Sequence, residues 1–205
     1  MKRFLLLLLL LAALWLAWQV EQNTGHLNNL QQAAPALAAF SAQKSPANGE
    51  RIRYIVTGSP TISAAFINLV LAAYRSPAAN TGQALYSLGV RYGIDPVYAL
   101  AFFMHESLFG RYGMATATRS LGNLRCIAGF PCYQGYAAFS SWQAGYAAWY
   151  KLIRSLYVDT WHLRTVAAII PTYAPAADHN APGAYITAVE RAVDAWRAGK
   201  VEVEP

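Results

Sequence analysis

The chain has 205 residues, with 16 Lys or Arg against 10 Asp or Glu, which gives a formal net charge of +6. Such a charge suits a protein that works on an acidic surface, although it is equally typical of a generic solubilising charge. The basic residues are scattered singly along the chain. Because nucleic-acid binding requires a clustered basic stripe, we expect no nucleic-acid partner.

The N-terminus has the order of an export signal. Lys2 and Arg3 precede an unbroken apolar run over residues 4–18. This run is long for the apolar core of a signal peptide, falls short of the ~20 residues that span a bilayer comfortably, and is followed by no Ala-x-Ala cleavage site. We therefore predict that residues 1–20 are a signal peptide or a membrane anchor, and that the rest of the chain is extracytoplasmic, either membrane-anchored or secreted.

Composition divides the remainder of the chain. Residues 21–49 are rich in Gln, Asn, Ala, Ser and Pro, and we interpret them as a linker. Residues 50–198 have the length and apolar content of one domain. Residues 199–205 form a short tail.

The first helices of that domain follow from hydrophobic periodicity. Residues 62–74 and 81–92 repeat apolar side chains at helical spacing, with a Pro-containing break between them. Asp95 and Pro96 provide an N-cap and a proline at the first helical position, so a third helix starts there. Gly110 and Gly113 are expected to end it.

After Gly113 the pattern becomes irregular and then helical again. Residues 111–140 lose the helical period, so we expect loops with a short hairpin. Helices are predicted at residues 141–156 and 165–170, the latter closed by Pro171, and a last helix begins near Pro182. Its apolar face comprises Tyr185, Val189, Ala192, Val193 and Trp196. The sequence thus predicts a mainly α domain with a small irregular or β lobe.

The two cysteines, Cys126 and Cys132, lie six residues apart in this irregular segment. In an exported protein such a pair is more often a disulfide than a metal site, and no His is near enough in sequence to complete a zinc set. We expect a covalent clip of the loop, with free thiols as the alternative. No metal or organic cofactor is predicted, because the chain contains no His-x-x-x-His, Cys-x-x-Cys or glycine-rich phosphate loop.

Glu106 is the candidate functional residue with the strongest physical argument. It is the only carboxylate between Asp95 and Asp159 in the sequence, and it lies within residues 97–110, a helical segment that is apolar on nearly every face. An unpaired buried carboxylate raises its pKa and keeps its proton near neutrality, which suits a general acid. The alternative is a Glu at a helix end that is turned to water or paired with an arginine such as Arg111.

Four segments, in this order, resemble those of glucosaminidase-type peptidoglycan hydrolases in the lysozyme-like superfamily. These segments are residues 105–110 (HESLFG), 121–125 (LGNLR), 139–145 (FSSWQAG) and 173–180 (YAPAADHN) followed by Tyr185. In that superfamily a Glu at the C-terminal end of a helix faces a groove walled by a small irregular or β lobe. The resemblance covers residues 92–196.

The resemblance makes Glu106 the catalytic acid and Tyr173 a groove tyrosine that positions the sugar. An exposed aromatic ring after the helix-ending Pro171 can stack on a sugar and offer its hydroxyl, and core packing is the alternative for Tyr173. The other substrate-binding candidates are Asn123, Tyr136, Asp178 and Tyr185.

The same candidates have structural interpretations. Asn123 can order the groove loop, and Asp178 or Asn180 can serve as a turn residue or N-cap of the last helix. We expect His105 to point away from the Glu106 face, and Ser107 to bond Glu106 or to finish the helix.

The resemblance implies an endo-β-N-acetylglucosaminidase that cleaves β-1,4 bonds of peptidoglycan glycan strands. A second carboxylate could come only from the downstream loops that hold Asp159 or Asp178, and this scarcity leaves open assistance by the substrate's N-acetyl group. The alternatives are a lytic transglycosylase or muramidase on the same fold, and a cell-wall-binding module without turnover.

Overall fold

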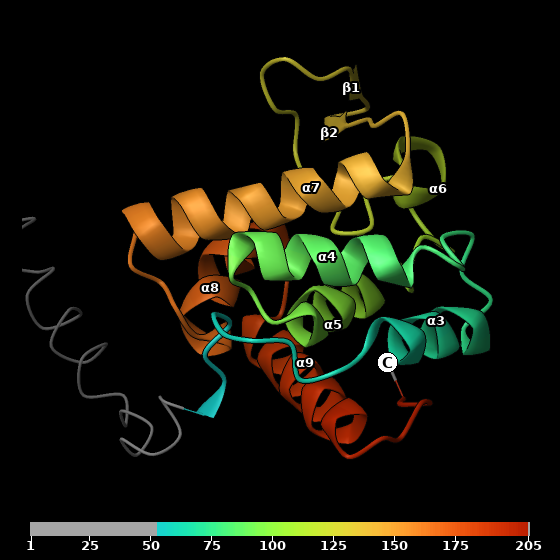
Figure 1. Cartoon of the computed structure of the whole chain (residues 1–205). Helices are drawn as coiled ribbons and strands as arrows, with labels where there is room; N and C mark the ends of the chain where they lie inside the picture. Colours follow the sequence, from blue (N-terminus) through green and yellow to red (C-terminus); the bar gives the residue numbers. More distant parts are fainter. Residues whose placement is uncertain (1–52, 205) are drawn as a thin grey trace, which may run out of the picture. The chain divides into compact units, whose positions relative to one another are not determined.

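The computed structural model describes residues 53–204, and it confirms a mainly helical fold with a small β lobe (Figure 1). The predicted N-terminal apolar segment and linker lie outside the described residues. No helix within the described part of the chain is long and apolar enough to cross a membrane. The elements are α3 (Ala64–Ala73), α4 (Gly82–Tyr92), α5 (Pro96–Ser107), α6 (Ala115–Thr118), β1 (Cys132–Tyr133), β2 (Tyr136–Ala137), α7 (Trp142–Leu152), the π-helix η1 (Ile153–Thr160), α8 (Val166–Tyr173), the 3-10 turn η2 (Ala176–Asp178) and α9 (Pro182–Arg197).

Helix α5 lies at the centre of the domain, between α4 and α9 (Figure 1). Ten of its 12 residues are buried, and the two exceptions are His105 and Glu106. The helix ends at Ser107, earlier than the glycines suggested, because Leu108 adopts a left-handed conformation with φ of 46°. The two polar residues therefore occupy the last turn, where the packing around α5 opens.

Asp95 fixes the start of α5. Its carboxylate is almost fully buried and accepts hydrogen bonds from the N–H of Val97 at 3.2 Å and from the N–H of Thr61 at 3.1 Å. The Thr61 hydroxyl donates at 2.7 Å, and Arg197 from the end of α9 forms an ion pair at 3.0 Å. Asp95 is thus both the predicted N-cap and the point that joins α9 to the start of α5.

The remaining helices surround α5 and α9. Helix α4 packs against α3 and α7, and α8 packs against α9. Helix α9 buries the five residues predicted from its periodicity. The expected C-terminal tail also packs on the domain, since Val203 is buried and its backbone bonds the Tyr74 hydroxyl.

Two other helix boundaries also differ from the sequence prediction. The helix after Ser141 does not stop near residue 156, because α7 continues into η1 with wider turns, as in the bond from the Trp161 N–H to the Leu156 carbonyl at 2.9 Å. Pro171 lies inside α8 instead of closing it. The proline removes one N–H, but the N–H of Ala174 still bonds the Ile170 carbonyl at 2.8 Å, so the last turn is retained.

The predicted irregular lobe contains the short hairpin. Strands β1 and β2 are antiparallel, with Cys132 opposite Ala137 and Tyr133 opposite Tyr136. A disulfide joins Cys126 to Cys132, with their Cα atoms 5.3 Å apart. This lobe lies beside α7 (Figure 1). Its residues form one side of the pocket described below.

Replacing Asp95 should be among the most destabilising single changes in this domain. Asp95→Ala removes a cap and leaves Arg197 without its partner, which we expect to cost about 3 kcal/mol in the free energy of unfolding. The matched control is Asp159→Ala, which breaks the exposed Arg154–Asp159 pair and should cost less than about 1 kcal/mol. Urea denaturation of both variants measures the difference, and equal losses would contradict this role for Asp95.

Candidate active site

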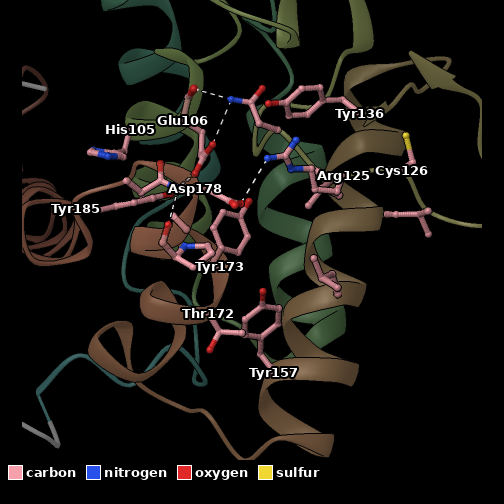
Figure 2. A pocket seen from close by; sticks show the side chains of 17 residues that line it. His105, Glu106, Arg125, Cys126, Tyr136, Tyr157, Thr172, Tyr173, Asp178 and Tyr185 are labelled. Atoms are coloured by element: carbon pink, nitrogen blue, oxygen red, sulfur yellow. Dashed lines mark hydrogen bonds and ion pairs between the residues drawn. The ribbon is translucent and has the colours of Figure 1, made fainter. Parts of the chain in front are cut away.

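A cavity of about 630 Å³ opens at the C-terminal end of α5 (Figure 2). Its walls come from segments far apart in the sequence: the end of α5, the loop after Gly122, the hairpin, η1, the end of α8 and the start of α9. The predicted residues Glu106, Asn123, Tyr136, Tyr173, Asp178 and Tyr185 all line it. The fold thus brings these residues together in one pocket.

Glu106 is held by two hydrogen bonds. Its Oε1 accepts from the Tyr185 hydroxyl at 2.8 Å, and its Oε2 accepts from Asn123 Nδ2 at 3.2 Å. It forms no ion pair with any arginine in residues 53–204, and the guanidinium of Arg111 lies over the Tyr112 ring instead. The alternative of a Glu106–Arg111 pair is therefore wrong.

Burial raises the pKa of Glu106 above its ordinary value. The hydrogen bonds from Tyr185 and Asn123, and the positive charge of Arg125, oppose this effect but do not cancel it. The cause is the loss of solvation of the charged form. A carboxyl group with this balance keeps its proton to a higher pH than an exposed glutamate does.

The loop that holds Asn123 is fitted closely to its neighbours. Asn123 adopts a left-handed conformation with φ of 47°, which Asn tolerates better than most residues, and its Nδ2 also donates to the Glu106 carbonyl at 2.7 Å. A Cβ on Gly122 would lie 2.6 Å from Trp149 Cδ1, so only glycine fits there. The Ser107 hydroxyl donates to the Leu121 carbonyl at 2.8 Å and makes no bond to the Glu106 carboxylate. These contacts fix the amide of Asn123 against Glu106.

Tyr173 borders the pocket, and its hydroxyl is bonded within the protein. The hydroxyl donates to the Gly122 carbonyl and accepts from Trp149 Nε1 at 3.2 Å, and the ring packs edge-on against Phe102. Two interpretations of Tyr173 were open, a hydroxyl offered to a sugar and core packing, and the structure shows a half-buried ring whose hydroxyl bonds Gly122 and Trp149. Its ring forms part of the pocket wall, and its hydroxyl braces the Gly122–Asn123 loop.

Tyr185 connects Glu106 to His105. The Tyr185 ring stacks on the His105 ring, with centroids 3.7 Å apart and planes at 23°. The expectation that His105 points away was wrong: adjacent helical residues are about 100° apart, so both can border one opening at the end of a helix. Partial burial lowers the pKa of His105, which favours its neutral form.

Asp178 forms an ion pair with Arg125, with the nitrogen and oxygen 3.6 Å apart (Figure 2). Asp178 does not cap α9, whose N-cap position is taken by Ala181, and Asn180 bonds the Pro175 carbonyl. Tyr136 lies beneath the Arg125 guanidinium, 5.0 Å from ring centroid to the guanidinium carbon. Asp159 pairs with Arg154 and does not line the pocket.

The polar lining residues that were not singled out from the sequence include Arg125, Tyr157 and Thr172. Arg125 stands within the LGNLR segment and is the one with a readable signal. Tyr157 lies in η1, which extends α7, and Thr172 lies in the part of α8 that continues past Pro171. Neither position was predictable from the expected helix ends. No group of three or more His, Cys, Asp or Glu side chains in residues 53–204 is arranged to hold a metal ion.

The fold has known counterparts among solved structures. The crystal structure of S. aureus Autolysin E matches with a TM-score of 0.51 at 14% sequence identity, covering 76% of this chain and 75% of that chain. A crystal structure of Autolysin E in complex with the muropeptide NAM-L-Ala-D-iGlu matches with a TM-score of 0.49 at 15% identity, covering 71% and 72%. No protein-family model and no curated protein matches the chain. At this identity the similarity establishes an α-rich lysozyme-like fold.

The raised pKa of Glu106 makes a signed prediction about stability. Between the unfolded pKa, near 4.5, and the higher folded pKa, the folded state binds more protons than the unfolded state, so the free energy of unfolding falls as pH rises. Glu106→Gln removes this dependence. The stability of the variant relative to the native protein should therefore increase from pH 4 to pH 7, measured by urea denaturation. A relative stability that decreases over this range would show that Glu106 is stabilised as an anion.

Proposed function

We propose that the protein is a peptidoglycan hydrolase that cleaves β-1,4 bonds of the glycan strand, most consistent with an endo-β-N-acetylglucosaminidase, with Glu106 as general acid. The observation that carries this proposal is the position of Glu106: a carboxyl group with a raised pKa, fixed by two hydrogen bonds, in the wall of an open pocket. A protonated carboxylic acid so placed can donate a proton to a glycosidic oxygen. The fold shared with an autolysin supports the choice of substrate.

The surroundings of Glu106 favour a mechanism with one acid. The chain has no Asp or Glu between Glu106 and Asp159, so the hairpin lobe offers no second carboxylate. Asp178 is the other carboxylate in the pocket lining, and it is paired with Arg125. Under this proposal the N-acetyl group of the substrate assists as positive charge develops on the sugar, while the aromatic wall holds the sugar in place.

A single acid also suits a lytic transglycosylase, so this remains the second candidate, with a muramidase as a third. A wall-binding module is disfavoured, because binding alone gives no reason to keep a carboxyl group where burial opposes its ionised form. We further propose that the apolar N-terminal segment, residues 1–20, exports the domain to the peptidoglycan.

Product analysis separates these candidates. Purified sacculi incubated with the full-length protein should yield reducing N-acetylglucosamine ends, identified by mass spectrometry. Reducing muramic acid ends would instead indicate a muramidase, and anhydro-muramic ends a lytic transglycosylase. Absence of any product, with retained binding to sacculi, would favour the binding module and contradict the proposal.

Glu106→Gln tests the assigned acid. Gln preserves the shape of the side chain but has no acidic proton, so hydrolysis of sacculi should fall by about 10²–10⁴-fold. Binding to sacculi and the melting temperature at neutral pH should be retained. Near-normal turnover by this variant would contradict the assignment.

Tyr185→Phe tests how the acid is tuned. The Tyr185 hydroxyl favours the ionised form of Glu106, so its removal should raise the pKa of Glu106 further. The alkaline limb of the pH profile of kcat/KM, where the acid loses its proton, should then move to higher pH. Tyr74→Phe is the matched control, because that hydroxyl bonds the backbone of Val203 and Tyr74 does not line the pocket. An unmoved limb in Tyr185→Phe would show that Glu106 is not the group that titrates.

A further inference from the structure

We propose that Arg125 determines substrate specificity by binding a carboxylate carried by the glycan strand, and that Asp178 occupies this position in the free protein. The inference rests on the proposed function and deepens it. It identifies the preferred substrate as a strand with acidic substituents beside the cleaved bond, in contrast to a neutral polymer of N-acetylglucosamine. Three properties of Arg125 support this role: its position in the pocket, its loose pairing with Asp178 and the charges around it.

Arg125 is held by its backbone and by the face of its guanidinium. Its backbone forms an isolated antiparallel bridge with Tyr136, and the guanidinium lies over the Tyr136 ring. Stacking of this kind leaves the N–H groups at the edge of the guanidinium available to an acceptor. The side chain lines the cavity and is 68% exposed, so a ligand in the pocket can reach it.

The pair between Arg125 and Asp178 is loose. The nitrogen and oxygen are 3.6 Å apart, longer than the ~2.7–2.9 Å of a charge-assisted hydrogen bond, and the Asp178 side chain is 52% exposed. By comparison, the Arg154–Asp159 pair on the outside of the pocket closes to 3.1 Å with a hydrogen bond. An exposed and elongated pair contributes little to stability, so a carboxylate from the substrate can replace Asp178 at small cost.

The charges around the pocket favour an anionic group at this wall. Arg125 is the one Lys or Arg among the lining residues that the structure describes. It lies near enough to Glu106 for its charge to lower the pKa of that group, so a ligand bound to Arg125 is close to the proton donor. Of the two sugars in peptidoglycan, N-acetylglucosamine carries no carboxyl group, whereas muramic acid carries a lactyl carboxyl that is either free or extended by an acidic peptide. Arg125 would therefore orient the muramic acid side of the strand.

The test compares soluble, peptide-bearing glycan strands with the same strands after their carboxyl groups have been converted to neutral amides. The native protein should cleave the amidated strands with kcat/KM lower by about three- to tenfold, the effect of losing one charge-assisted contact. Arg125→Gln should lower kcat/KM on acidic strands by a similar factor and abolish the discrimination, and Arg125→Lys should restore part of it. Asp178→Asn removes the competing carboxylate. It should therefore increase the ratio of kcat/KM on acidic strands to kcat/KM on amidated strands.

Arg154→Gln is the matched control, because it breaks a similar exposed pair away from the pocket and should keep the native discrimination. Strands whose peptides have been removed by an amidase carry free lactyl carboxylates and separate the two sources of the charge. If the native protein still cleaves these peptide-free strands faster than their amidated form, Arg125 contacts the lactyl carboxylate. If it cleaves the two forms equally, Arg125 contacts a carboxylate of the peptide.

Two results would overturn the inference. An equal effect of Arg125→Gln on acidic and amidated strands would make Arg125 a brace for the hairpin, and abolition of cleavage of both by Asp178→Asn would make Asp178 a catalytic carboxylate. Failure of the native protein to cleave any strand would contradict the proposed function instead. In that case the inference is tested by measuring how tightly the native protein and Arg125→Gln bind acidic and amidated strands. The inference requires that the native protein binds acidic strands more tightly and that Arg125→Gln binds both equally.

Discussion

The partial burial of the Glu106 carboxyl group near the end of α5 is the constraint around which the pocket is arranged. Glu106 ends a helix whose other residues, apart from His105, are buried, so its polar atoms need partners from other elements. Tyr185 supplies one from α9 and Asn123 supplies one from the loop after Gly122. Because desolvation outweighs these hydrogen bonds, the pKa of Glu106 is raised and its neutral form is favoured.

The residues that hold Tyr185 and Asn123 in place belong to the aromatic core. Phe102, one helical turn before Glu106, contacts the rings of Trp149, Tyr173 and Tyr185. The Tyr173 hydroxyl and Trp149 in turn hold the Gly122 loop that carries Asn123. The same core that stabilises the domain therefore fixes the geometry of the proposed acid, and a change deep in the aromatic cluster should alter the site as well as stability.

The sequence predicted the helical fold and the position of Glu106, because periodicity, the Asp95–Pro96 start and an apolar helix interrupted by one carboxylate are local signals. Prediction from the sequence failed where contacts between distant residues determine a helix end or a side-chain partner. The π-helical extension of α7 and the continuation of α8 through Pro171 depend on packing, and so does the bond from the Tyr173 hydroxyl to the Gly122 carbonyl. The pairing of Arg125 with Asp178 joins residues 53 positions apart (178 − 125) and has no signature in either segment.

The ionisation of Glu106 is the property on which the proposed activity depends most directly. A titration of the protein labelled with ¹³C at the glutamate side-chain carboxyl groups, followed by NMR, measures it, and the Glu106→Gln variant identifies the resonance. We predict a midpoint for Glu106 above the ordinary value of 4.5, and a further increase in Tyr185→Phe. A midpoint at or below 4.5 in the native protein would show that the group is stabilised as an anion and would contradict its assignment as a neutral proton donor.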